Sequence, residues 1–137
     1  MPARKASYDY TLIRVVPRVE RGECMNVGVV LMCRQRGFLG ARIALDEARL
    51  LALFPFASVD DIRAQLHAIA KIAEGDKMAG PIAALSQAER FHWLVSPRST
   101  IVQPSPVHSG LCDDAAAALE HLFQTMVLLP NDAEDKV

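Results

Sequence analysis

The chain has 137 residues, of which 51% are hydrophobic and 23% charged, and its net charge is −1. This length and composition predict one globular domain with a hydrophobic core and argue against a disordered chain. A net charge so close to zero gives no general attraction to nucleic acid or to anionic membranes, and aromatic residues, at 6%, offer few platforms for base stacking. We therefore expect neither a nucleic acid nor a membrane as a partner.

Charge is unevenly distributed along the chain. Residues 1–50 hold nine Lys/Arg against five acids, a net of +4, whereas residues 51–137 hold six against eleven, a net of −5. Either the two halves mix their charges on the surface of one fold, or the N-terminal half forms a basic face. The sequence leaves both interpretations open.

The cysteine pattern and the N-terminus indicate a compartment. Cys24, Cys33 and Cys112 are odd in number and lack C-x-x-C spacing, which is typical of reduced thiols in a cytosolic protein. The N-terminal residues lead into no long apolar segment of the kind that a signal peptide has. No apolar run reaches the roughly 18 residues that a membrane span needs. We predict a cytoplasmic protein with three free thiols.

The first third of the chain predicts strands. In residues 8–16 the side chains of Tyr8, Tyr10, Leu12 and Val16 fall on one face of a strand and those of Ile13 and Val15 on the other. Arg14 interrupts the pattern, and Pro17 ends it. Residues 26–33 (NVGVVLMC) are nearly continuous in apolar side chains, which predicts a central strand covered on both faces. Residues 38–45 alternate again after the short polar connection 34–37, so these two strands should form an antiparallel hairpin.

Capping residues and apolar stripes predict helices further along. The four expected helices run from Asp46 through Phe54, from Ser58 with Asp61 to a stop at Gly75, from Ser86 with Glu89 through Val95, and from Asp113 or Asp114 through the stripe that ends at Val127. A further strand at residues 99–103 is left open. Segregated strands and helices define an α+β fold, here a small antiparallel sheet of three to four strands with helices packed on one face. The predicted organisation is a flexible N-terminus (1–7), a single α+β domain (8–129) and a flexible C-terminal tail (130–137).

Residues 91–110 (FHWLVSPRSTIVQPSPVHSG) form the most distinctive segment, because prolines bound a polar stretch with two His, one Arg, several hydroxyls and the only Trp. Loops of this chemistry often carry function. No G-x-S-x-G elbow and no phosphate-binding glycine motif is present. His108 and Cys112 lie four residues apart without a second close pair of ligands, so we expect no metal centre.

Two further interpretations remain open for the charged residues. Arg98, with the hydroxyls of Ser99 and Thr100, would offer a fork of donors to a phosphate if another Arg lay nearby; the candidates are Arg14, Arg18, Arg21 and Arg90. Alternatively these Arg side chains pair with neighbouring acids and orient loops. Glu20 and Glu23 would serve acid–base chemistry or simply form a solvated turn, and the turn is the simpler interpretation.

Two blocks of sequence resemble a known family. The first contains YDY, IRVVPRVER and NVGVVL within residues 8–31, and the second contains RFHWL, PRS and QPSPVHSG within residues 90–110. They are similar to the bacterial family catalogued as domain of unknown function 3037, over about residues 8 to 127. The resemblance brings no established activity; it implies a small bacterial cytosolic protein, often encoded beside a HipA-like serine/threonine kinase, and so favours a partner-binding module.

Ten polar residues of these blocks form the candidate binding site: Arg14, Arg18, Glu20, Asn26, Arg90, His92, Arg98, Ser99, Gln103 and His108. We expect a non-enzymatic accessory or regulatory module that binds a protein partner, with a HipA-like kinase as the candidate, and that uses no cofactor. The alternative is a small enzyme, or an anion- or nucleotide-binding protein, that uses an Arg/His-lined loop. Convergence of Arg14, Arg18, Arg98 and His108 in one pocket would favour the alternative. We also expect residues 97–110 to lie against the first strand.

Overall fold

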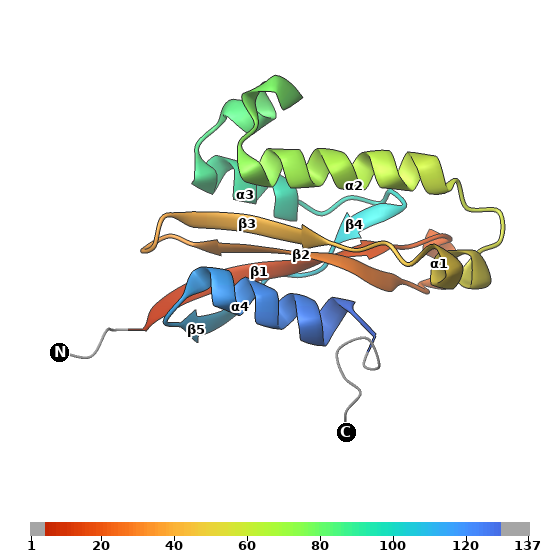
Figure 1. Ribbon diagram of the computed structural model, residues 1–137. Coiled ribbons are helices and arrows are strands. Elements are labelled where there is room, and N and C mark those ends of the chain that lie inside the picture. The colour runs from red at the N-terminus through yellow and green to blue at the C-terminus, as the bar shows by residue number, and fades with distance from the viewer. Residues whose placement is uncertain (1–4, 130–137) are drawn as a thin grey trace.

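The computed structural model describes residues 5–129, which form a five-stranded antiparallel sheet with helices on both faces (Figure 1). The strands are β1 (Ala6–Val15), β2 (Met25–Cys33), β3 (Phe38–Ile43), β4 (Val102–Pro104) and β5 (His108–Cys112). Their order is β3-β2-β1-β4, and β5 also pairs with β1. The antiparallel sheet and the predicted hairpin of β2 and β3 are confirmed.

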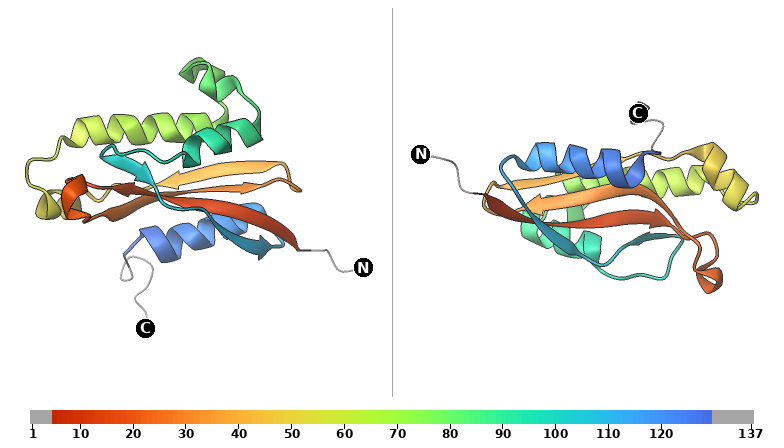
Figure 2. Two further views of the ribbon diagram at one scale, coloured as in Figure 1. Left: turned by 180° about the vertical axis from the view of Figure 1, so that it is seen from behind. Right: turned by 90° about the horizontal axis from the view of Figure 1, so that it is seen from below.

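The main helices are α1 (Glu47–Leu53), α2 (Val59–Glu74), α3 (Gln87–Val95) and α4 (Ala115–Leu122), which continues as a π-helical turn (Phe123–Val127). Figures 1 and 2 show α2 and α3 on one face of the sheet and α4 on the other. The α+β class is therefore confirmed, whereas the prediction that the helices pack on one face is wrong. Both faces need a cover because the central strands are apolar on both sides.

Two separate cores follow from this arrangement. Val27 and Val30 of β2 pack with Ile62, Leu66 and other residues of α2 and α3. Val29, Leu31 and Cys33 of β2 face the opposite way, where Leu119, Leu122 and Phe123 cover them. Of the nine residues of β2 only Asn26 is not buried, as the continuous apolar run predicted.

The edge of the sheet beside β1 is built from two short strands in place of one. β4 pairs with residues 13–15 of β1, and β5 pairs with residues 6–10. Between them, the buried Ser105 bridges the gap: its N–H donates to Leu12 O at 2.7 Å, and its hydroxyl accepts from Leu12 N at 2.9 Å. The sheet therefore has five strands where three to four were predicted. Of residues 97–110, those from Ile101 on lie against β1 as expected, whereas Arg98 lies beside α3.

The helix ends match the local signals. Asp46, Ser86 and Asp114 each accept a hydrogen bond from a backbone N–H in the first turn of their helix, and Ser86 with Glu89 forms a complete capping box. Ser58 holds the N-cap position of α2 without a side-chain hydrogen bond. At the end of α2, Gly75 adopts a φ of 75°, the left-handed conformation that favours glycine.

The predicted domain limits differ from the structure at one end. β1 already begins at Ala6, which pairs with Cys112, while Ser7 pairs with Leu111. Residues 6 and 7 thus belong to the sheet and not to a flexible N-terminus. The predicted tail, residues 130–137, lies outside the described residues, as do residues 1–4.

The three cysteines differ in exposure, and this yields a testable expectation. Cys24 is exposed, whereas Cys33 and Cys112 are buried, and none forms a disulfide. Burial and a hydrogen bond with Cys33 raise the pKa of the Cys112 thiol, which keeps it in the unreactive thiol form. Iodoacetamide should modify Cys24 in the native protein and reach the two buried thiols only after denaturation, as read by mass spectrometry. Modification of native Cys112 as fast as Cys24, or an intramolecular disulfide in non-reducing spectra, would contradict the assignment.

Candidate functional site

The structure distributes the ten candidate residues over four places. His92 and Arg98 line one surface beside α3, with Ser99 exposed on the loop that follows; Arg14, Asn26 and His108 lie on the face of the sheet that α4 covers in part; Arg18 and Glu20 lie in the turn after β1; and Arg90 is buried. Gln103, on the edge strand β4, belongs to both of the first two places, since it borders a hollow with Arg98 and pairs with Arg14. Arg14, Arg18, Arg98 and His108 therefore do not converge in one pocket.

The most structured of these places centres on a stacked pair at the end of α3. The guanidinium carbon of Arg98 lies 4.6 Å from the centre of the Trp93 ring. The same guanidinium donates to Trp93 O at 2.9 Å and to Ser96 O at 3.4 Å, so a cation lies at the C-terminal carbonyls of the helix. Partial burial lowers the pKa of Arg98. The guanidinium is thus held in one orientation before any ligand arrives.

Three shallow hollows meet at this pair. One, of about 400 Å³, lies along α3 between Leu85, His92 and Trp93. A smaller one of about 150 Å³ lies between Trp93, Arg98 and α2. The third, of about 430 Å³, lies between Arg98, Gln103 and Val107. Trp93 borders the first two hollows and Arg98 the last two, so the three are adjacent. We name this part of the molecule the Trp93 surface and define it by Leu85, His92, Trp93, Arg98, Gln103 and Val107.

The chemistry of the Trp93 surface is amphipathic. Trp93, Leu85 and Val107 are between 37% and 43% exposed, so the surface offers three large apolar side chains to a partner. Pro97, Pro104 and Pro106 border the third hollow and fix the backbone dihedral φ on each side of it. The result is a stiff apolar surface with one oriented cation at its centre.

A second group lies in register across three strands. Arg14 of β1 is opposite both Asn26 of β2 and Gln103 of β4. Ile13 and Val15 point into the core on the α2 side, so Arg14 points to the other face. Asn26 Nδ2 donates to Met126 O at 3.0 Å, which links this row to the end of the α4 segment. Within the described residues the Nε atom of Arg14 is buried without a hydrogen-bond partner.

His108 belongs to the same face but has a different neighbour. It is the cross-strand partner of Tyr10, and the two ring centres lie 5.5 Å apart. Tyr8, two residues before Tyr10 on the same face of β1, packs over its cross-strand partner Gly110. A Cβ at Gly110 would lie 2.5 Å from the Tyr8 hydroxyl. The packing of Tyr8 thus explains why position 110 is a glycine. His108 is exposed at the end of the row formed with Tyr8 and Tyr10.

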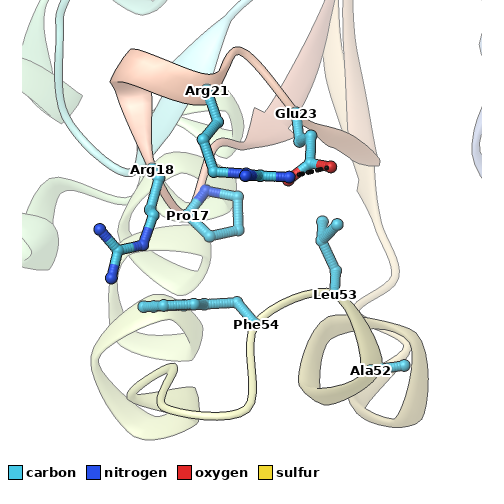
Figure 3. Close-up of a pocket in the computed structure, with 7 residues that line it drawn as sticks. All are labelled: Pro17, Arg18, Arg21, Glu23, Ala52, Leu53 and Phe54. Carbon is cyan, nitrogen blue, oxygen red and sulfur yellow. Dashed lines mark hydrogen bonds and ion pairs between the residues drawn. The ribbon is translucent and has the colours of Figure 1, made fainter.

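A third place is the hollow between the turn after β1 and α1 (Figure 3). It has a volume of about 390 Å³, and Pro17, Leu53 and Phe54 supply its apolar lining. The guanidinium carbon of Arg18 lies 5.8 Å from the centre of the Phe54 ring. Arg18 also pairs with Glu20 at 3.4 Å.

A second ion pair closes the other side of this hollow. Arg21 donates to both carboxylate oxygens of Glu23, at 2.8 and 3.0 Å. This hydrogen bond raises the pKa of Arg21 and lowers that of Glu23. Both cations of the hollow therefore have an acidic neighbour, as the loop-orienting interpretation of these residues expected.

Arg90 has a structural role. Its Nη1 donates to Ile72 O at 3.0 Å and to Ala73 O at 2.8 Å, and its Nε donates to Leu85 O at 3.0 Å. Only 8% of the residue is exposed. The side chain thus satisfies the last carbonyls of α2 from within the fold and does not face a ligand.

The described residues show neither a metal-binding cluster nor a helix suited to a membrane. Among residues 5–129, no three His, Cys, Asp or Glu side chains gather in a way that would hold a metal ion. Over the same residues, no helix combines the length and the apolar character that crossing a bilayer requires.

The candidate set omitted residues that define these hollows. Trp93 is the only Trp of the chain but is absent from the predicted site. Leu53 and Phe54 are absent as well, because the sequence pattern predicts only that they belong to a helix. A signal for Trp93 was available. Phe91 and Leu94 form the buried side of α3, which leaves a Trp next to His92 on the polar side.

The fold and these surfaces define a class: a small α+β protein with a doubly covered antiparallel sheet and an exposed Trp–Arg surface beside its third helix. The model of the family described as protein of unknown function (DUF3037) matches residues 10–127. The chain therefore belongs to that family, as the two sequence blocks indicated. No curated protein and no solved structure matches the chain.

Proposed function

We propose that this protein is a bacterial, cytoplasmic accessory or regulatory module that does no chemistry of its own and binds a protein partner through the Trp93 surface. The observation that carries the proposal is the stacked pair of Trp93 and Arg98 at the junction of three hollows. Trp and Arg are the side chains most enriched among residues that dominate binding energy at protein interfaces. Rigid surfaces also lose less entropy when they bind.

The separation of Arg18, Arg98 and His108 supports the same proposal over the enzyme or anion-binding alternative. Arg18 pairs with Glu20, Arg98 lies over the Trp93 ring, and the His108 ring lies tilted against that of Tyr10. The alternative expected these groups in one pocket, and none of the hollows described above, all formed by residues 5–129, is lined by two of them. Their separation favours a surface that recognises a shape and an exposed apolar side chain.

A HipA-like serine/threonine kinase is the partner we propose to test first. The sequence resemblance supports this choice, since such kinases are often encoded beside members of the family. The experiment is a titration of the purified kinase from the same genome against this protein, followed by calorimetry. A measurable dissociation constant supports the proposal, and its absence at the highest soluble concentrations would reject this kinase.

Replacement of the central pair tests the surface itself. Trp93→Ala and Arg98→Ala should each raise the dissociation constant about 30-fold or more, the size of an interface hot spot. Met126→Ala is the matched control, because Met126 is exposed to a similar degree, 42% against 37% for Trp93, on the opposite side of the sheet. Unchanged binding by both variants of the pair would show that the partner docks elsewhere.

A further inference from the structure

The end of the molecule formed by the turn after β1 and by α1 exposes apolar side chains beside the hollow of Figure 3. Phe56 is 87% exposed, and its ring meets Phe54 edge-on with 6.5 Å between ring centres. Val19 and Leu51, from the same two segments, are 49% and 39% exposed. Phe54 itself lines the hollow, so a protruding aromatic ring and a hollow with a partly apolar lining lie next to each other on one surface.

The hollow has the size and lining to accept an aromatic ring. Its volume of about 390 Å³ falls within the range of small-molecule pockets, and Pro17, Leu53 and Phe54 offer apolar contacts. Phe56 of the same chain lies outside this hollow, since it is not among the residues that line it. An aromatic side chain from another molecule would therefore find both space and an edge-to-face partner in Phe54.

The charges at the rim of this hollow alternate in sign along the turn. Arg18, Glu20, Arg21 and Glu23 follow one another, and the two Arg pair with the two Glu within the chain. A row of this kind carries no net charge, so two identical copies do not repel each other. When a two-fold axis reverses one row against the other, Arg of one copy can face Glu of the second.

We propose that the protein forms a two-fold symmetric dimer through this end, with Phe56 of each copy seated in the hollow between Pro17, Leu53 and Phe54 of the other. A contact of this symmetry uses the same patch twice, and therefore needs the projecting side chain and its receptor side by side. The alternating rim favours a second copy of this chain, because the two rows can place opposite charges against each other. The dimer leaves the Trp93 surface out of the contact and does not depend on its proposed role.

Sedimentation over a concentration series tests the dimer. The parent protein should pass from monomer to dimer, and Phe56→Ala should raise the dissociation constant about 30-fold or more, as expected for a central aromatic anchor. The fold should survive, because the ring is almost fully exposed. Met78→Ala is the matched control, since Met78 is 93% exposed and lies in the turn after α2. A parent that stays monomeric, or a Phe56→Ala dimer as tight as the parent, overturns the proposal.

Charge reversal gives a second, independent test. Arg18→Glu with Arg21→Glu makes the rim acidic, and Glu20→Arg with Glu23→Arg makes it basic; each double variant alone should dimerise at least tenfold more weakly than the parent. An equimolar mixture of the two should recover association as a heterodimer, which native mass spectrometry distinguishes by mass. If the mixture associates no better than its components, the rims do not face each other and the proposed geometry is wrong.

Discussion

Arg90→Met should lower the free energy of unfolding by about 3–5 kcal/mol, because three charge-assisted hydrogen bonds to backbone carbonyls are lost at once. Met fills much of the space of the Arg stem, so the change removes the donors more than the packing. Leu85 O has no second donor among the described hydrogen bonds, and Ala73 O lies at the end of α2. Urea denaturation followed by circular dichroism measures the loss.

Two variants calibrate this result. Arg90→Lys keeps the charge but replaces a planar fork with a single ammonium, so it should lose part of the stability and not all of it. Arg63→Met removes an exposed Arg of α2 that pairs with Glu47, and should cost about 1 kcal/mol or less. A loss below about 1 kcal/mol for Arg90→Met would show that water replaces the guanidinium at these carbonyls.

The features that depend on near neighbours in the chain could be predicted from the sequence. The capping box of Ser86 and Glu89, the cap at Asp46 and the left-handed Gly75 each act over four residues or fewer. The apolar run of β2 likewise predicted a strand covered on both faces. Such local signals fix where most elements begin and end.

Features that depend on pairing between distant segments could not be predicted. The segment that forms β5, His108–Cys112, contains Ser and Gly and shows no alternation, and it becomes a strand because β1 supplies its hydrogen bonds. The position of α4 was missed for a related reason. Its apolar stripe showed that one side is buried, but the stripe does not say which face of the sheet it covers.

The candidate site likewise has one part that could be predicted from near neighbours in the chain and one part that could not. Arg98 and Trp93 are five residues apart, and both fell within the segment singled out from the sequence. Arg14 and Arg18 also lie close in the chain, yet Arg14 points from the sheet face while Arg18 lies beyond Pro17 in the turn that follows. Their closeness in the chain suggested that Arg14 and Arg18 would share one pocket. They do not, because β1 ends between them and Arg18 lies in the turn that follows.

Helix α3 links the stability of the protein to its proposed function. Its inner side carries Arg90, Phe91 and Leu94, which are buried, and its outer side carries His92 and Trp93, which are exposed. Variants of the inner side change stability and would disturb binding only by moving the helix. Variants of the outer side should change binding alone, so the two sides provide internal controls for each other.

Leu66→Ala should cost about 2–5 kcal/mol, because Leu66 is only 2% exposed and packs between α2 and the sheet, where its loss leaves a cavity. Burial at this position was predicted from the apolar stripe of the helix and is confirmed by the structure. Leu111→Ala is the matched control: the same side chain is lost, but Leu111 is 66% exposed on β5, so stability should change by no more than about 0.5 kcal/mol. Equal losses for the two variants, or a loss below about 0.5 kcal/mol for Leu66→Ala, would mean that α2 does not pack on the sheet through this stripe.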